Sequence, residues 1–344
     1  MATLEVTTIS DMIASTLNAQ DYKITDLSTT TQEYFALPQL LKPGKTQTQD
    51  GGTQIDVNIM HSTNGQAKFV APGEIDIYAY KDVLAKGQCP WRMFNTNWVY
   101  DTRLQDMNSG KVEQILKWIE VQSLAGMKAL AVLMEDAFWS KPATSSDVKT
   151  IWGVGNYAVK NASQGFNGGN PSGFTTGCIF DSTVRTNWAN YTDQYAAISK
   201  PDLVTKMRRG ALMTRFINPI PDGQLRSPAL QRAYYACQDV YIAFGTLAED
   251  QNDALGNDIA SKEGRVLFMG HPVAWVPELD GDAQDPIYQL DWSTLGFTFL
   301  KGQAMNRKKP RINPLQHLEL VVDVDGVGNL TCNDRRRLAV FATA

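Results

Sequence analysis

Residues 108–138 read NSGKVEQILKWIEVQSLAGMKALAVLMEDAF, the longest stretch of helical pattern in the chain. Its apolar side chains recur at intervals of three and four residues, which is the spacing of one face of an α-helix. Asn108 and Ser109 precede the pattern and are residue types that cap the amino end of a helix. At about 1.5 Å per residue, the pattern predicts a helix roughly 45 Å long that could span a whole subunit. The apolar positions expected in the core are Val112, Ile115, Leu116, Ile119, Leu124, Met127, Leu130, Leu133 and Met134.

The segment before this helix has the alternating apolar and polar pattern of half-buried strands. One such run covers residues 54–59, and a second covers 75–80, after an Asn-Gly and a Pro-Gly turn signal. A third, aromatic-rich run covers residues 92–100. We therefore expect a long hairpin with a polar, charged tip around residues 64–88.

The chain after the helix mixes all three kinds of structure. Residues 141–180 are rich in Gly, Ser and Asn and predict loops with short strands. Helical patterns lie at about 200–215 and 231–249, followed by a strand at 265–269. The remainder, 285–344, is dominated by strand patterns.

Composition narrows the class of protein. The 344 residues are 43% apolar and 20% charged, as in ordinary folded domains, which excludes a disordered chain. The net charge of −4 provides no overall positive field for a polyanion, so bulk nucleic-acid binding is not indicated. No run approaches the ~20 apolar residues of a membrane-spanning helix. The amino terminus, MATLEVTTISDMIAS, lacks the pattern of a secretory signal, so we expect cytoplasmic synthesis.

No motif marks a catalytic, cofactor or metal site. The four cysteines lie far apart without C-x-x-C spacing, which argues against a zinc ribbon or a dithiol redox site. The segment Asp323-Val-Asp-Gly326 lacks the further ligands of a calcium loop and is predicted to be a hairpin turn. His61, His271 and His317 are isolated in sequence and are interpreted as structural. We expect no enzymatic activity and no cofactor.

Four groups of residues, in order along nearly the full chain, point to a family. They are NSGK at 108–111; FDSTVRTNW with Tyr191 at 180–191; GRVLFMGHPVAWVP and DPIY within 264–288; and DW, FLKG, QH and CNDRRR within 291–337. Together they resemble segments of the major capsid proteins of tailed bacteriophages, which have the Hong Kong 97 fold. The order and spacing of the segments, rather than any single motif, carry this resemblance.

The resemblance implies an α+β fold of the Hong Kong 97 type with defined parts. We expect an N-terminal arm at 1–50, an extended hairpin loop at 51–105, the spine helix with part of the peripheral domain at 106–150, an axial domain at 151–284, and terminal strands of the peripheral domain at 285–344.

The implied function is that of a major capsid protein, which self-assembles into hexamers and pentamers that form the icosahedral shell around phage DNA. The expected partners are other copies of the chain, a portal, a cement protein and packaged double-stranded DNA held by nonspecific contacts, but no membrane. Because the long amino-terminal extension of some family members is absent, a separate scaffolding protein is expected. The virion is the expected location, after assembly in the host bacterial cytoplasm. A carbohydrate-active or nucleic-acid-binding accessory protein is the alternative.

Two groups of residues are expected to contact neighbouring subunits. Apolar residues at the hairpin tip would lie far from the subunit's own helix, and an exposed apolar surface of that kind marks an interface. The run Met305-Asn-Arg-Lys-Lys-Pro-Arg311 is the most basic patch, and it would meet acidic residues of the tip. Arg335-Arg-Arg337 is open to the same interpretation, on a strand where the side chain of Arg336 would point opposite to those of its two neighbours. The expected contact residues are Lys68, Phe69, Glu74, Asp76, Asp82, Arg307, Lys308, Lys309 and Arg311.

Overall fold

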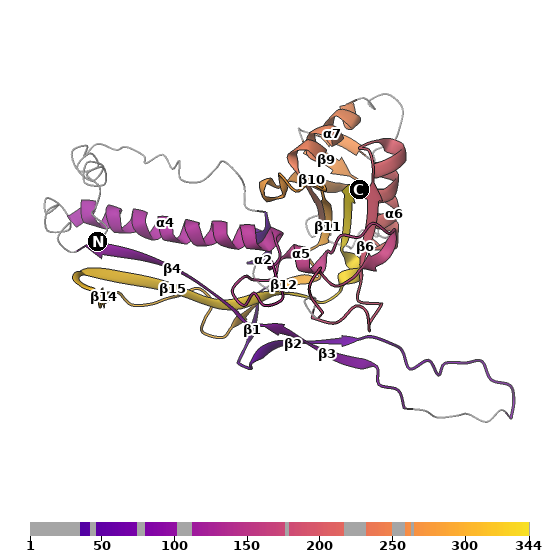
Figure 1. Cartoon of the computed structure of the whole chain (residues 1–344), viewed down its shortest axis with the longest axis horizontal. Coiled ribbons are helices and arrows are strands. Elements are labelled where there is room, and N and C mark those ends of the chain that lie inside the picture. Colours follow the sequence, from indigo (N-terminus) through magenta and orange to yellow (C-terminus); the bar gives the residue numbers. More distant parts are fainter. Residues whose placement is uncertain are drawn as a thin grey trace. The chain divides into compact units, whose positions relative to one another are not determined.

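The computed structural model describes residues 35–41, 46–73, 80–101, 112–175, 179–216, 232–249, 259–262 and 265–343 (Figure 1). Within these residues the chain divides into two compact units. One comprises Phe94–Leu133 and Met305–Gly326, and the other comprises Phe35–Met93, Met134–Ala304 and the residues from Val327 onward. Helices and mainly antiparallel sheets occur in both, so the predicted α+β class is confirmed.

Helix α4, Val112–Trp139, confirms the long helix predicted from the sequence. Its carboxyl-terminal part buries Leu130, Met134 and Phe138, which recur every four residues and therefore share one face. The side chains of residues 112–120 lie outside the described part of the chain, so the predicted burial of Val112, Ile115, Leu116 and Ile119 stays a prediction.

Three of the apolar positions expected in the core of this helix are exposed instead. Leu124 and Leu133 are 54% and 53% exposed, and Met127 is also exposed. Between residues 121 and 134 the only charged side chain is Lys128, so the helix is apolar on nearly all sides. The subunit covers part of that circumference, which is why periodicity alone did not separate the buried face from the exposed one.

A six-stranded sheet is built around one long strand, β15, Gln316–Cys332. Its pairing partners are β12 (Leu295–Leu300), β13 (Asn306–Arg307), β14 (Arg311–Asn313) and β4 (Arg92–Asp101), and β12 also pairs with β1 (Gln47–Gln49). The hairpin turn expected at Asp325-Gly326 is wrong, because β15 continues through both residues. A Cβ on Gly326 would overlap the ring of Phe94, so this glycine permits close packing and does not form a turn.

An eight-stranded sheet forms the centre of the larger unit. Its strand order is β5 (Gly165–Gly168), β6 (Asn190–Tyr195), β16 (Ala339–Thr343), β11 (Ile287–Asp291), β7 (Arg232–Ala236), β10 (His271–Trp275), β9 (Arg265–Phe268) and β8 (Ile259–Lys262). Helix α6, Thr205–Met213, contacts β6 and β16, whereas α7, Gln238–Glu249, contacts β8, β9 and β10.

Two features of this sheet differ from the sequence-based expectation. The strands after residue 285 divide between two sheets, since β11 and β16 belong here and β12 to β15 belong to the six-stranded sheet. The helix expected at 231–249 begins as strand β7, whose residues 233–236 are all buried. A short, continuously buried run has no alternation that distinguishes a strand from a helix. The predicted domain boundaries themselves stay a prediction.

Shorter elements complete the described structure. No helix within the described ranges is long and apolar enough to cross a membrane. The remaining elements are α2 (Ala36–Leu40), β2 (Gln54–Met60), β3 (Leu84–Pro90), α5 (Val154–Tyr157), the π-helix η1 (Lys200–Val204) and the 3-10 helices η3 (Pro277–Leu279) and η4 (Arg335–Arg337).

The two classes of leucine on α4 allow a matched test of its buried face. We expect Leu130→Ala to lower the free energy of unfolding by about 2–5 kcal/mol, because it opens a cavity at a side chain that is 2% exposed. Leu124→Ala should change it by about 0.5 kcal/mol or less, as surface substitutions do. Denaturant unfolding of the subunit measures both, and equal losses would contradict the assigned faces.

Candidate assembly surfaces

The root of the hairpin consists of strands β2 and β3, which pair antiparallel from Gln54 opposite Pro90 to Met60 opposite Leu84 (Figure 1). One face of this ribbon is buried against the subunit and the other is exposed, in strict alternation on β3. A Cβ on Gly87 would overlap the side chains of Ile179 and Phe180, so the glycine lets that segment lie directly on the strand. The buried side chains of the ribbon are Ile55, Val57, Ala85 and Cys89.

The hairpin tip is shorter than the range 64–88 expected from the sequence, because strand β3 already begins at Leu84 and pairs with β2. The strand predicted at 75–80 falls almost wholly outside the described residues, so it stays a prediction. The buried face of β3 carries Ala85, Gly87 and Cys89, which are too small to produce a recognisable alternation of large apolar residues. The signal is missing because the bulky partners, Ile179 and Phe180, come from a distant part of the chain.

Beyond its root, the hairpin presents apolar side chains to solvent. Phe69 and Tyr80 are almost fully exposed, and Val70 is 56% exposed. Lys68 and Asp82 are also exposed, and Asp82 Oδ1 accepts a hydrogen bond from the Leu84 amide at 3.2 Å. Glu74 and Asp76, predicted as contact residues, lie outside the described residues. An exposed aromatic and aliphatic cluster on an extension is typical of a surface that a partner covers.

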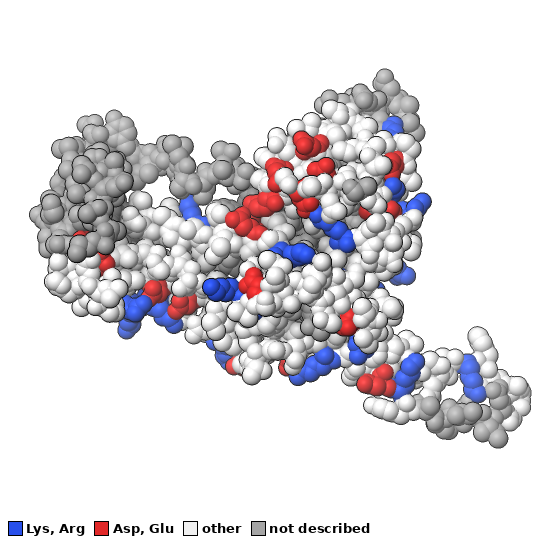
Figure 2. Space-filling view, in the orientation of Figure 1, with Lys and Arg blue, Asp and Glu red and all other residues white. Residues whose placement is uncertain are grey.

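The basic run has partners inside its own unit. The Arg307 guanidinium lies 5.4 Å from the centre of the Trp98 ring, and Arg311 Nε and Nη2 each lie 2.9 Å from Asp323 Oδ2. Lys308 Nζ lies 3.9 Å from Asp325 Oδ2, whereas Lys309 is exposed. The partners Trp98 and Asp323 are largely covered, whereas the side chains of Lys308, Lys309 and Arg311 keep much of their surface exposed. Basic and acidic residues lie side by side around β14 and β15 (Figure 2). Ion pairs with an exposed member contribute little to stability, so these cations remain available to a neighbour.

The carboxylates that pair with this run, Asp323 and Asp325, were not identified as partners from the sequence. A turn was expected at these positions, whereas β15 continues and places both beside β13 and β14. The register pairs Arg307 with Val324 and Arg311 with Val321, which brings the acids within reach. Contacts between the basic run and a neighbouring subunit stay a prediction.

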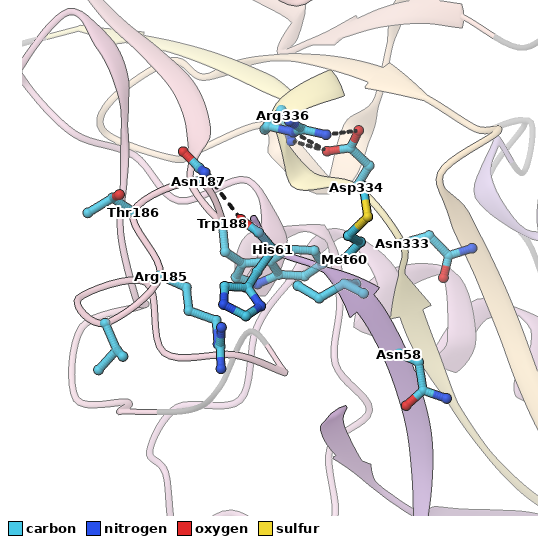
Figure 3. Close-up of a pocket in the computed structure, with 12 residues that line it drawn as sticks. Asn58, Met60, His61, Arg185, Thr186, Asn187, Trp188, Asn333, Asp334 and Arg336 are labelled. Atoms are coloured by element: carbon cyan, nitrogen blue, oxygen red, sulfur yellow. Dashed lines mark hydrogen bonds and ion pairs between the residues drawn. The ribbon is translucent and has the colours of Figure 1, made fainter. Parts of the chain in front are cut away.

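A polar hollow of about 440 Å³ lies at the root of the hairpin (Figure 3). The end of β2 and the turns at 184–188 and 333–336 line it. Asp334 holds the Arg336 guanidinium through Nε at 3.0 Å and Nη2 at 3.2 Å. Asn187 Nδ2 donates to the His61 carbonyl at 3.5 Å. Amide and guanidinium donors dominate this lining, so it is suited to polar contact.

Arg335, which lies between the lining residues Asp334 and Arg336 in the sequence, is fully buried, and the hydrogen bonds it makes go to neutral acceptors. Its Nε donates to Tyr157 O at 2.8 Å and its Nη1 to Trp188 O at 2.8 Å. Its Nη2 contacts Gly169 O at 2.9 Å, Asn190 Oδ1 at 3.0 Å and Gly168 O at 3.3 Å. One side chain thus joins α5, the 184–188 turn, β5 and β6.

The arginine triplet therefore differs from the strand expected at 335–337. It forms the 3-10 helix η4, in which the Asp334 side chain accepts the Arg336 amide. Arg336 pairs with Asp334, and Arg337 Nη1 lies 3.6 Å from Asp291 Oδ2. The sequence suggests one basic patch, but the three arginines have different environments: Arg335 is buried, Arg336 pairs with Asp334, and Arg337 lies near Asp291. The tight 3-10 helix directs successive side chains to different sides.

The first segment of the described chain is fastened to α4 by a buried carboxylate. Glu135, 2% exposed, accepts hydrogen bonds from the amides of Phe35 at 3.1 Å, Ala36 at 2.9 Å and Leu37 at 3.0 Å. The Trp139 indole also donates to it at 2.9 Å. The amides are those that the short helix α2 leaves without an internal partner, so the carboxylate replaces a cap.

Burial shifts the pKa of two cysteines and one histidine away from the values that favour reactivity. Burial raises the pKa of the Cys89 and Cys237 thiols, which keeps them protonated. Burial also lowers the pKa of His271, whose Nε2 lies 2.9 Å from Phe216 O. Among the described residues, no group of three or more His, Cys, Asp or Glu is arranged to hold a metal.

Comparisons with known proteins give matches among solved structures alone. No family model matches the chain, and no curated protein matches its sequence. The capsid asymmetric unit of cyanophage A-1(L) matches with a TM-score of 0.60 at 12% identity, over 94% of this chain and 96% of that chain. The mature capsid asymmetric unit of bacteriophage PhiM1 matches with a TM-score of 0.53 at 14% identity, over 94% and 91%.

The chain has the Hong Kong 97-type fold. A third similar structure with this fold, the holo-SrpI encapsulin complex from Synechococcus elongatus PCC 7942, has a TM-score of 0.54 at 13% identity, over 96% of this chain and 94% of that chain. The match extends over nearly the whole of each chain, so the fold class predicted from the sequence is confirmed. The assignment of the arm, the hairpin loop and the two domains to residue ranges stays a prediction.

Substitution of Arg335 tests whether its buried hydrogen bonds stabilise the fold. We expect Arg335→Lys to lower the free energy of unfolding by about 3 kcal/mol or more, because an ammonium cannot reach five acceptors that the planar guanidinium serves together. Arg336→Lys, the adjacent exposed position, should cost under ~1 kcal/mol. Thermal melting of the two variants compares them, and a mild effect at both positions would refute the role of Arg335.

Proposed function

We propose that the chain is the major capsid protein of a tailed bacteriophage, which assembles into hexamers and pentamers of an icosahedral shell around double-stranded DNA. The observation that carries the proposal is the full-length match to shell proteins, including phage capsids, combined with an exposed apolar hairpin tip. Such a subunit works by self-association: identical chains repeat the same set of contacts until the shell closes. It carries out no reaction of its own.

The hairpin is suited to this role because its root and tip have opposite character. The root is buried through Ile55, Val57 and Gly87, which fixes the direction in which the extension leaves the subunit. The tip exposes Phe69 and Tyr80 almost completely. A rigid root lowers the entropy lost when the tip binds a neighbour, so modest contacts sum to a stable shell.

The remaining expectations follow from the same proposal. The virion would be the site of function, after assembly in the bacterial cytoplasm with a scaffolding protein and a portal, and with a cement protein on the outside. The predicted parts would be the arm, hairpin, peripheral domain and axial domain. The contact residues would be those of the hairpin tip and the basic run.

An encapsulin-type shell is a second candidate, because the SrpI encapsulin complex matches this chain as completely as the phage capsids do. Both candidates predict shells, and the contents distinguish them: DNA released from particles purified from infected cells supports the phage capsid. The alternatives from the sequence, a carbohydrate-active or nucleic-acid-binding accessory protein, predict compact monomers. Electron microscopy of the purified full-length protein separates shells, rings or sheets from those monomers.

Shortening the hairpin tests assembly separately from folding. Replacing residues 64–80 with a two-residue Asn-Gly turn keeps the β2–β3 register, which pairs Ile59 with Ala85 and continues to His61 and Val83. We expect an unchanged melting temperature and no closed shells by electron microscopy. Phe69→Ser with Val70→Ser should weaken closure in the same direction. Normal shells from the shortened chain would exclude the hairpin as the assembly element.

The basic run offers a second, electrostatic test. We expect Lys308→Glu with Lys309→Glu to slow or block assembly, because the run would meet carboxylates of Glu74, Asp76 or Asp82 where three neighbours converge. Melting of the unassembled subunit should change by less than ~1 kcal/mol, since exposed pairs contribute little. Light scattering over a range of salt concentrations follows assembly, because salt screens such contacts.

Two controls accompany the charge reversal. Lys149→Glu, at an exposed lysine away from the run, should leave assembly unchanged. Reversing the acidic partner to Lys should restore assembly of the double variant. If the double variant assembles normally at every salt concentration, its lysines are merely solvated.

A further inference from the structure

The polar hollow at the root of the hairpin contains a cation without a counter-charge. Two arginines, Arg185 and Arg336, and one carboxylate, Asp334, are among its lining residues, so with His61 neutral the lining carries a net charge of +1. Asp334 is already paired with Arg336. The half-buried Arg185 guanidinium makes no hydrogen bond or ion pair with any residue in the described part of the chain.

The turn that carries Arg185 is fixed by the protein itself. The Arg185 amide donates to the Asp181 carbonyl at 3.0 Å, and the Trp188 amide donates to the Arg185 carbonyl at 2.8 Å. The Trp188 ring is buried and packs edge-on against Phe180, with 5.0 Å between the ring centres. A partner that binds Arg185 therefore meets a backbone that is already ordered, which lowers the entropy lost on binding.

The other wall of the hollow includes His61, whose backbone is also held. Its amide donates to the Val83 carbonyl at 3.0 Å, and its carbonyl accepts Asn187 Nδ2 (Figure 3). The ring atom Nδ1 is buried and has no hydrogen-bond partner among the described residues. An orphaned polar atom of this kind is typical of a site that a ligand or a partner completes.

The shape and chemistry of the hollow indicate which ligand fits. A guanidinium binds a carboxylate or a phosphate through two parallel hydrogen bonds. Two lining residues, Met60 and Val184, are apolar and are 69% and 77% exposed. The volume of about 440 Å³ is many times the roughly 30 Å³ of one water molecule, so a small inorganic anion would leave most of it unfilled. An acidic side chain on a peptide segment uses both the cation and the apolar rim.

The chain itself supplies carboxylates that lack a cation. Asp136 and Glu278 are exposed, and neither forms an ion pair with a described residue. Partial burial, and then repulsion from neighbouring carboxylates such as Glu135, raises the pKa of both. A guanidinium from another molecule would relieve this repulsion. The hollow and these carboxylates all belong to the larger unit.

We propose that the hollow binds an acidic side chain of a second copy of this chain, with Arg185 as the cation and Asp136 or Glu278 as the first candidates for its partner. Because the two patches differ, the contact is head-to-tail and repeats from copy to copy around a ring. The inference names one contact of the proposed shell and therefore rests on the proposed function.

Cross-linking identifies the occupant directly. Arg185→Lys places an amine in the hollow, and a carbodiimide condenses that amine with a touching carboxylate to form an amide. We assemble a mixture of isotope-labelled and unlabelled subunits and analyse the linked peptides by mass spectrometry. The expected product joins position 185 to Asp136, Glu278 or another acidic residue of a different copy. Arg336→Lys is the matched control, which should link to Asp334 of its own chain.

Assembly provides the second readout. We expect Arg185→Gln to raise the protein concentration needed for assembly about tenfold, as for the loss of one charge-assisted contact per subunit. The melting temperature of the unassembled subunit should stay unchanged, because the guanidinium has no partner in the described part of its own chain. Lys149→Gln, which removes a charge at an exposed site outside the hollow, should leave assembly unaffected.

Three results would overturn the inference. One is a link from position 185 that stays within its own chain. Another is the absence of any link at position 185 in shells where Arg336→Lys reacts. The third is inorganic phosphate that raises the melting temperature of the unassembled wild-type subunit but not of Arg185→Gln, which would identify a free anion as the occupant. Failure of the inference leaves the shells intact, whereas a wild-type chain that forms no assembly at all contradicts the proposed function and this contact with it.

Discussion

A buried guanidinium with neutral partners sets the strongest constraint on this fold. Arg335 carries a full charge at a site with no solvent exposure, and each nitrogen of its planar fork meets an oxygen. Burying such a charge is tolerable only when every donor is satisfied, so the carbonyls of Tyr157, Trp188 and Gly169 must converge on it. The edge of the eight-stranded sheet and the turn beside the hairpin root therefore depend on one residue.

Close approaches between backbone and aromatic rings impose the second constraint. Gly326 admits the ring of Phe94, Gly126 admits Trp98 and Gly87 admits Phe180. In each case the glycine lies in a regular strand or helix, where it weakens the element but lets a large ring pack directly on the backbone. These contacts join segments that are distant in sequence.

The exposed apolar groups have a different significance on the hairpin and on the helix. Phe69 and Tyr80 lie on an extension whose root is fixed, which suits contact with another subunit. Leu124 and Leu133 lie on a helix that also buries Leu130, so their exposure reflects an apolar helix of which the subunit covers only one side.

The sequence by itself determined the long helix, the α+β class and the Hong Kong 97-type fold, because these rest on periodicity and on the order of segments along the chain. It located the exposed tip residue Phe69, since an apolar residue among turn signals has no local partner. Only the tertiary structure decided that β3 pairs with β2, that β15 continues through Gly326, and that Arg335 is buried. Each of these depends on a partner from a distant part of the chain, and local pattern contains no information about such partners.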